Sequence, residues 1–313
     1  MMKITAGIAN ADQLRLYREA GADEFYCGYV PDFWVDKVGT GVPLNRREVR
    51  YCPVQIGGRN ELRLLRASAA SLDVPVALTF NAPCYPPEAI PFAVRAIEQC
   101  LSDGFDSFII ADPALLQALQ ESSLLPSIRL HISGEAGEIN RAALEFWRSF
   151  HPNRIIFHRK VGLANIASLI RSDREAHPEA SLEYEAFAMN EFCHFNGAFC
   201  SAPHCDELAH LCHLPWRLAP VHSGDPLPST PPFSTPDEEI AGHSGCGVCA
   251  LPSLARAGIT TLKVVGRGAD TDEMIRDIRV LRTALTLSEH GASPDEIRQS
   301  CFPDGCSKNC YYP

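Results

Sequence analysis

The feature that most constrains the fold is a repeated alternation of short apolar runs with longer amphipathic stretches. Eight such runs occur, and most are continuous rather than alternating, as is typical of parallel strands covered on both faces. The count predicts an α/β protein, a (β/α)8 TIM-type barrel, because an open doubly wound sheet usually has fewer strands and a glycine-rich first turn. The predicted strands are Lys3–Ile8, Glu24–Gly28, Val74–Phe80, Ser107–Ala111, Ile128–Ile132, Arg154–His158, Leu182–Phe187 and Thr261–Val265.

Helix signals fill the intervals between these runs. Pro87 and Pro113 stand where helices would begin, and Asp112 is a residue type favoured at the helix N-cap. One helix is therefore expected after Pro87. The other predicted helices are Ala11–Ala20, Asn60–Ser71, Ala114–Glu121, Asn140–Ser149, Leu163–Arg174 and Asp270–Ser288.

Composition narrows the class of protein. The 313 residues are 46% hydrophobic and carry a formal net charge of −10, so the chain can bury a large core and shows no basic footprint for nucleic acid. No apolar run approaches the roughly 20 residues of a membrane span, and the first residues lack the pattern of a signal peptide. We therefore expect a cytoplasmic protein with a small-molecule substrate, no membrane contact, and nucleic acid as an unlikely partner.

The alternation is interrupted once, between the seventh and eighth strands. Residues 188–250 contain six His and six Cys, and the part Ala219–Gly245 contains six prolines. We predict one barrel domain over residues 1–292, with 188–250 as an insertion loop and 293–313 as a cysteine-containing tail. Because barrel enzymes carry their chemistry on the loops that follow strands, this insertion is well placed for a functional site.

Thirteen cysteines without an export signal suggest metal binding rather than disulfides. Six of them lie in the insertion, where four thiolates would suit an iron–sulfur cluster or a structural zinc ion. Spacing alone leaves iron–sulfur, zinc and unligated thiols open, because there is a single CxxC pair and no CxxxCxxC. The six are Cys193, Cys200, Cys205, Cys212, Cys246 and Cys249.

The cysteine segments resemble those of the collagenase-like peptidase family U32, which includes oxygen-independent ubiquinone- and RNA-hydroxylation proteins. The first two cysteines occur in CHFNGAFCS from Cys193, and the third precedes Pro and Arg in CHLPWR from Cys212. Cys246 stands twelve residues before Gly258, with a Leu-Pro between them and LKVVGR following. Further similarities lie in GADEFYCG, LTFNA, FIIADPALL and LHISGEAGEIN, which contain Asn81, Asp112, Ser133 and Asn140.

The resemblance implies a four-iron four-sulfur cluster bound by Cys193, Cys200, Cys212 and Cys246, with Cys205 and Cys249 as alternative ligands. Studied relatives act as oxygen-independent hydroxylases, some of which take the oxygen atom from prephenate. We therefore expect an iron–sulfur hydroxylase or related redox enzyme acting on a small organic substrate. The alternatives are a peptidase, or a cluster-bearing non-catalytic subunit of a heteromeric complex.

Several polar residues just after predicted strands are candidates for the catalytic pocket. We predict that Asn81, His158, Arg159 and Arg267 line it, with the two arginines binding a carboxylate. The structural alternatives are that the arginines form surface ion pairs and that His158 is a hydrogen-bonded histidine of the core. Further positions just past strands, or at the end of one, are Asp112, which an N-cap role would explain, Glu135 and His131.

The remaining cysteines divide into three groups. Cys27 ends the second strand, where it either reaches the barrel mouth as a ligand or packs as a small apolar residue, and Cys52 and Cys84 share this ambiguity. Cys100 on an apolar helix face is predicted to lie in the core. The tail cysteines hold or complete a metal site, or belong to a terminus with unligated thiols: Cys301, Cys306 and Cys310.

Two motifs common in peptidases are missing from the sequence, so it gives little support to the peptidase alternative. The sequence contains neither a G-x-S-x-G elbow nor HExxH. A cysteine peptidase would have to use one of the 13 thiols, and no spacing singles one out as the nucleophile.

Overall fold

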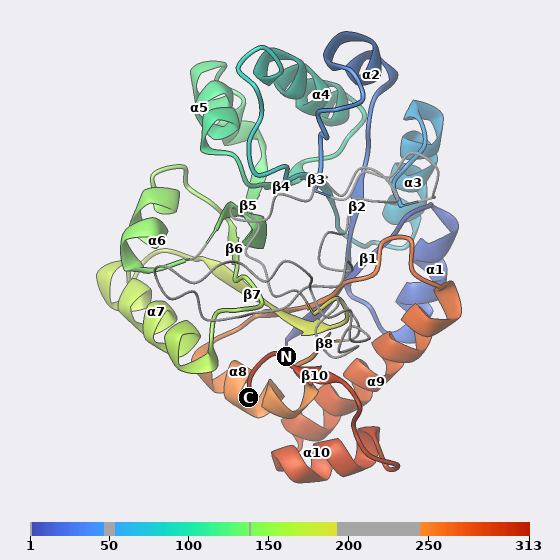
Figure 1. Cartoon of the computed structure of the whole chain (residues 1–313), viewed down its shortest axis with the longest axis vertical. Coiled ribbons are helices and arrows are strands. Elements are labelled where there is room, and N and C mark those ends of the chain that lie inside the picture. The colour runs from blue at the N-terminus through green and yellow to red at the C-terminus, as the bar shows by residue number, and fades with distance from the viewer. Residues whose placement is uncertain (1, 47–53, 138, 193–244) are drawn as a thin grey trace, which may run out of the picture.

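The computed structural model describes residues 2–46, 54–137, 139–192 and 245–313, and it shows a closed parallel barrel surrounded by helices (Figure 1). Eight parallel strands form the wall in chain order, and β9 pairs with both β1 and β7 to close it. The (β/α)8 prediction is confirmed. The wall strands are β1 Lys3–Gly7, β2 Glu24–Gly28, β3 Val76–Phe80, β4 Ser107–Ile110, β5 Arg129–Ile132, β6 Arg154–Ile156, β7 Glu183–Met189 and β9 Thr261–Val264.

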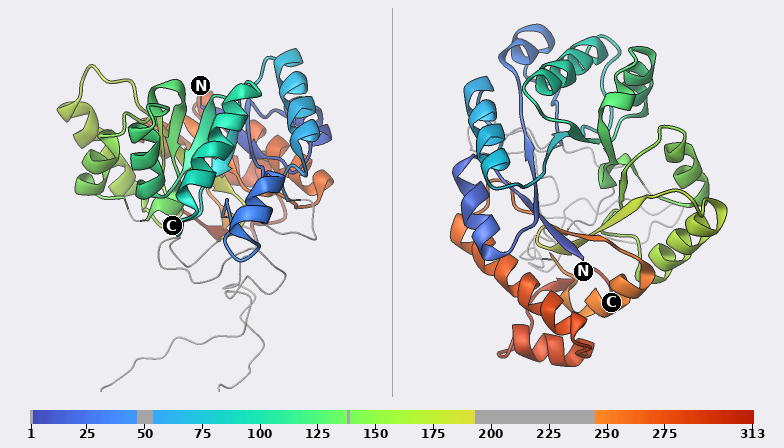
Figure 2. Two further views of the ribbon diagram at one scale, coloured as in Figure 1. Left: turned by 90° about the horizontal axis from the view of Figure 1, so that it is seen from above. Right: turned by 180° about the vertical axis from the view of Figure 1, so that it is seen from behind.

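Helices form the outer ring, as the right view of Figure 2 shows. Each predicted helix is present within a few residues of its expected bounds, and three more that the sequence pattern missed are α2, α8 and α10. The helices are α1 Asp12–Ala20, α2 Asp32–Val38, α3 Arg59–Ser71, α4 Ile90–Ser102, α5 Pro113–Glu121, α6 Arg141–Arg148, α7 Leu163–Ala176, α8 Leu251–Ala257, α9 Thr271–Glu289 and α10 Pro294–Cys301. Short 3-10 turns cover Leu125–Ser127, Gly134–Ala136 and Val248–Ala250.

Two short strands extend the sheet beyond the barrel wall. Strand β8 (Gly245–Cys246) pairs antiparallel with the end of β7, and β10 (Asn309–Cys310) pairs parallel with β8. The two ends of the predicted insertion are therefore part of the sheet, since β7 runs on to Met189 and β8 begins at Gly245. The tail is also structured, with a helix and a strand that the sequence did not predict because each is too short for a periodic signal.

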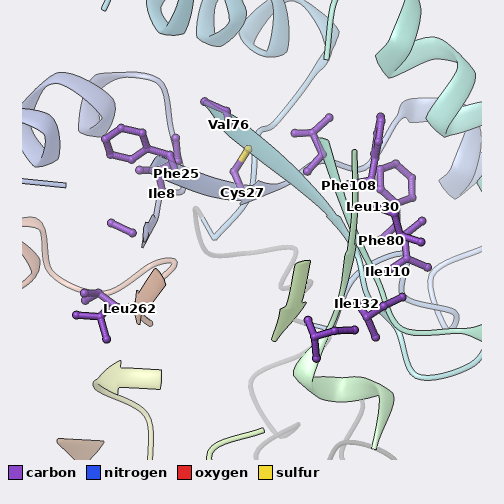
Figure 3. Packing of buried hydrophobic residues seen from close by; sticks show 14 of the residues in the cluster. Ile8, Phe25, Cys27, Val76, Phe80, Phe108, Ile110, Leu130, Ile132 and Leu262 are labelled. Carbon is purple, nitrogen blue, oxygen red and sulfur yellow. The ribbon is translucent and has the colours of Figure 1, made fainter. Parts of the chain in front are cut away.

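Side chains alternate between two cores along each wall strand, as the period of a β-strand requires. One set points outward and packs against the helices; Figure 3 shows members of it, including Phe25, Cys27, Phe80 and Phe108. The other set points into the barrel and forms a smaller apolar cluster: Tyr26, Ala77, Ile109, Ile156, Phe187, Val265 and Tyr311.

Charged side chains fill the amino-terminal end of the barrel interior. Arg154 is 3% exposed, and its Nη1 lies 2.8 Å from Glu24 Oε2 and 3.0 Å from Glu185 Oε2. Lys3 Nζ lies 2.9 Å from Glu24 Oε1, and Lys263 Nζ lies 2.8 Å from Glu185 Oε1. The cations and carboxylates at this end thus neutralise one another around a cavity of about 590 Å³.

No helix among the described residues is long and apolar enough to cross a membrane.

Candidate functional site at the carboxyl end of the barrel

A pocket opens at the carboxyl ends of the wall strands, the end at which barrel enzymes carry their chemistry. Its floor is apolar and comes from the interior cluster, through Tyr26, Ile109, Ile156, Phe187 and Val265. Four cationic side chains line it, against two carboxylates. The cations are Arg46, Arg159, Lys263 and Arg267, and the carboxylates are Glu135 and Glu191.

Arg267 follows β9 and is 5% exposed. Its Nη1 donates to Asn45 Oδ1 at 3.0 Å and to Thr79 Oγ1 at 3.2 Å. A Cβ added at Gly28 would lie 2.4 Å from Nη1, so only glycine leaves room for this guanidinium at the end of β2. The Asn45 and Thr79 side chains thus orient the Arg267 guanidinium at the pocket.

Arg159 follows β6 and is held by the end of β7. Its Cζ lies 4.4 Å from the Phe187 ring centroid, a cation–π contact, and its Nη1 donates to the Glu191 backbone oxygen at 2.8 Å. Its Nη2 is 3.8 Å from Glu135 Oε1, too long for a good hydrogen bond. Buried Nε of Arg159 has no hydrogen-bond partner among the described residues.

Arg46 approaches from the segment after β2. Its backbone N–H donates to Asn81 Oδ1 at 3.0 Å, and its Nε lies 3.2 Å from Glu135 Oε2. The Asn81 Nδ2 in turn donates weakly to Ser133 Oγ at 3.4 Å. Asn81 therefore joins two loops of the mouth, and Glu135 is shared between two arginines.

Lys263 connects the pocket to the charged amino end. Its Nζ lies 3.7 Å above the Tyr26 ring and donates to Glu185. Burial lowers the pKa of Lys263 below its usual value of 10.5, and the Glu185 carboxylate opposes this shift.

The structure brings together three of the four predicted catalytic residues. Asn81, Arg159 and Arg267 line the pocket. The fourth, His158, is 1% exposed and does not line it; its Nδ1 accepts the backbone N–H of Lys160 at 3.2 Å.

Two further candidates also have structural roles. Asp112 is the N-cap of α5, since its Oδ1 accepts from Ala114 N at 2.8 Å, and its other oxygen accepts from Tyr85 N. His131 lines the cavity at the amino end of the barrel, at the opposite end from the mouth. Burial and the charges of Arg154, Lys263, Arg129 and Lys3 hold its pKa well below 6.5.

Sequence reasoning missed Arg46, Thr79 and Lys263. Strand parity could have identified the last two, because residues two apart on a strand face the same side and both strands were predicted. Arg46 lies in an irregular segment, for which the sequence offers no periodic signal.

One of the four predicted cluster ligands can be located. Cys246 on β8 is 5% exposed, and it sits opposite Met189 in the β7–β8 pairing. Burial raises the pKa of its thiol to about 12. Cys193, Cys200 and Cys212 lie outside the described residues, as do the alternative Cys205 and the loop residue Cys52.

The tail cysteines lie near the same strand. Cys310 is in register with Cys246 across the β8–β10 pair. Burial raises the pKa of the Cys249 thiol, and the nearby Cys306 and Cys310 raise it further. Cys301 Sγ contacts the Val280 carbonyl. Within the described ranges, no three His, Cys, Asp or Glu side chains are grouped so that they could hold a metal ion.

The other cysteines do not reach the mouth. Cys27 points outward into the helix–strand core, beside Val76 in Figure 3, and burial raises its pKa to about 12. Cys27 therefore packs as a small apolar residue and does not reach the barrel mouth as a ligand. Cys100 on α4 is fully buried, as expected, and Cys84 is exposed after β3.

Comparison with known proteins adds relatives of low identity. The chain is 31% identical over 88 residues to the tRNA hydroxylation protein P of Haemophilus influenzae, covering 28% of this chain and 17% of that protein. It is 27% identical over 100 residues to the protein of the same name from Escherichia coli, covering 32% and 20%. The chain thus matches a fifth or less of either relative's length. The structure of the U32 peptidase Mk0906 aligns with a TM-score of 0.40 and 15% identity, over 60% of this chain and 69% of that one.

The match that spans nearly the whole chain is to a family model. Residues 9–304 match the model of peptidase family U32, a range that includes the mouth arginines, β8 and most of the tail. This agrees with the resemblance carried by the cysteine segments. The chain belongs to peptidase family U32.

Proposed function

We propose that the protein is an iron–sulfur-dependent, oxygen-independent hydroxylase or related redox enzyme, whose barrel mouth binds a carboxylate-bearing ligand. The observation that carries this proposal is the convergence of three arginines on the mouth: Arg46, Arg159 and Arg267. The Glu191 carbonyl positions Arg159, and the Asn45 side chain positions Arg267. Guanidinium groups bind carboxylates through paired, charge-assisted hydrogen bonds. The name of the two curated relatives supports hydroxylation as the reaction class.

The proposed cluster is a four-iron four-sulfur centre with Cys193, Cys200, Cys212 and Cys246 as ligands, and with Cys205 or Cys249 as substitutes. The placement of Cys246 fits this role. Asn190 N donates to Gly245 O at 2.8 Å, so Cys246 lies beside the strand end from which the chain continues to Cys193. When bound, the cluster would supply redox or Lewis-acid chemistry next to the mouth.

The protein's own residues would bind and orient the ligand. Arg267 and Arg159 would bind the carboxylate of the ligand, and the Asn81 amide would fix the orientation of the ligand. The apolar floor of Tyr26, Phe187 and Val265 would exclude water from the reacting end. His158 does not face the pocket, so it would act by holding the turn that carries Arg159.

The relatives add a second class of substrate to the carboxylate-bearing ligand that the pocket suggests. Both curated relatives are named for tRNA hydroxylation, which weakens the expectation that nucleic acid is an unlikely partner. A nucleoside of tRNA is therefore a candidate substrate beside a small organic molecule. The net charge of −10 gives no broad basic surface, so RNA binding would need a heteromeric partner or a restricted contact.

The test begins with anaerobic purification, iron and sulfide analysis, and absorption near about 400 nm, where thiolate-bound clusters absorb. We expect about four irons per chain, lost in Cys246→Ala and kept in Cys100→Ala. Calorimetric titration with prephenate should then show binding to the wild type. Iron-free protein under these conditions would overturn the cluster, and zinc at one per chain would assign a structural site instead.

A peptidase is the second candidate, suggested by the family. Burial raises the pKa values of the Cys27, Cys100 and Cys301 thiols, which is the opposite of what a cysteine nucleophile needs. Collagen or gelatin cleavage that survives removal of iron would favour this alternative over the hydroxylase.

A further inference from the structure

We infer that Tyr311 and Tyr312 are positioning residues for the mouth: they fix Phe187 and the end of β7, and through them the ligand-binding guanidinium of Arg159. The inference deepens the proposed function, since it assumes that Arg159 binds the ligand. It rests on contacts among described residues that are more than one hundred positions apart in the chain.

The tail reaches the mouth through strand pairing. Strand β10 pairs with β8, and Tyr311 N donates to Cys246 O at 2.9 Å. The Tyr311 side chain is 4% exposed and belongs to the interior cluster rather than to the helix–strand core. A tail residue therefore packs against the side chains that form the floor of the pocket, without lining the pocket itself.

Two glycines make room for the tyrosine rings. A Cβ added at Gly245 would lie 2.3 Å from Tyr311 Cε1, and one at Gly247 would lie 2.9 Å from Tyr312 Cε2. Both glycines flank Cys246 on β8. The bare backbone on either side of Cys246 is the surface against which the two rings pack.

The hydroxyl groups bind backbone oxygens of the β7 end. Tyr312 Oη donates to Phe187 O at 3.0 Å, at the point where a register shift interrupts the β7–β9 ladder. Tyr311 Oη donates to Asn190 O, and its ring lies 6.4 Å from that of Phe187. Both carbonyls thus have partners that the barrel wall does not supply.

Asn190 joins the same contacts to the rest of the barrel. It adopts a positive φ of 69°, its Nδ2 donates to Asp277 Oδ2 at 2.7 Å, and its Oδ1 accepts from Lys308 Nζ at 3.2 Å. The tail therefore holds Asn190 at two points, Lys308 and Tyr311. Asparagine adopts the left-handed region more readily than most residues, and these contacts fix its side chain and carbonyl there.

Arg159 depends on the two groups that the tail fixes. Its guanidinium stacks on Phe187 and donates to Glu191 O, the residue after Asn190. If the end of β7 moves, the ring and the acceptor move with it. Removing a tyrosine hydroxyl should therefore weaken ligand binding without removing any group that touches the ligand.

A double-mutant cycle tests this with prephenate as the probe. Tyr311→Phe keeps the ring and removes the hydroxyl, so we expect its dissociation constant for prephenate to rise roughly fivefold. In an Arg159→Met background the same change should have less than a twofold effect, since Arg159 is no longer there to be positioned. Tyr312→Phe should behave alike, and Tyr17→Phe, a buried tyrosine of α1, is the matched control. Equal effects in both backgrounds would overturn the inference.

A second measurement needs no ligand and separates this inference from the proposed function. The side-chain Nε signal of Arg159, assigned by its loss in Arg159→Lys, reports the order of the guanidinium by NMR. We expect Tyr311→Phe with Tyr312→Phe to lower its order parameter, and Tyr17→Phe to leave it unchanged. An unchanged Arg159 signal in the double variant refutes positioning. If the wild type does not bind prephenate but the double variant shows the NMR effect, the result refutes only the proposed ligand.

Discussion

The two ends of the barrel interior hold similar side chains in opposite balance. At the amino end Arg154, Lys3 and Lys263 face Glu24, Glu183 and Glu185, so that three cations balance three carboxylates within the fold. At the carboxyl end three arginines line a pocket with two carboxylates, and the Asn45 and Thr79 side chains orient Arg267. An internally paired set contributes to the stability of the barrel, whereas an unbalanced set attracts an anion. Changes at the amino end should therefore alter stability, and changes at the carboxyl end should alter binding.

The largest expected effect is at the amino end. Arg154→Met leaves Glu24 and Glu185 buried with one cationic partner each, and breaking a buried pair in this way costs about 3–5 kcal/mol. Urea unfolding should show that loss, and exposed Arg276→Met should show almost none. A loss below about 1 kcal/mol would mean that the network contributes little to the fold.

The next effect is at the mouth. Arg267→Met removes a guanidinium that lines the pocket, so we expect prephenate affinity to fall about 10- to 100-fold while the urea midpoint changes little. Calorimetry gives the affinity, again with Arg276→Met as the control. Unchanged affinity together with lost stability would reverse the contrast between the two ends.

Gly28→Ala sharpens the comparison without changing any charge. The new Cβ would lie 2.4 Å from Arg267 Nη1, so the guanidinium must move away from Asn45, and we expect prephenate affinity to fall about tenfold. Gly162→Ala is the control, because a Cβ there meets nothing within 4 Å. An affinity equal to that of the control would show that the position of Arg267 is not critical.

The smallest effect concerns pH. His131 has its pKa held well below 6.5, so it stays neutral in the folded protein while the unfolded chain takes up a proton below about that pH. Stability should therefore decline as pH falls below about 6.5, by at most about 1.4 kcal/mol per pH unit from this group. His131→Gln should flatten that slope in urea unfolding across pH 4.5–7, and exposed His151→Gln should not. An equal slope in wild type and His131→Gln would place the acid sensitivity elsewhere, for example in Glu24, whose pKa is lowered by Arg154 and Lys3 against burial.

The barrel could be predicted from the sequence because each wall strand buries both faces, which leaves continuous apolar runs. The arginines after β6 and β9 could be predicted because strand ends converge at one mouth. Arg46 could not, since it lies in an irregular segment. Neither could Tyr311 and Tyr312, because a two-residue strand carries no periodicity and its partner β8 lies 64 positions earlier in the chain.

The direct pairing of β7 with β9 has a consequence for protein engineering. The wall closes through Glu185↔Thr261 and Phe187↔Lys263, and Asn190 N already bonds Gly245 O. The span 193–244 therefore connects two backbone positions that are already neighbours, and it is not needed to complete the wall. A short glycine–serine bridge in its place should give a compact barrel in which closing the loop costs less conformational entropy. Such a minimal scaffold would retain the mouth arginines and accept a transplanted segment of different length or chemistry.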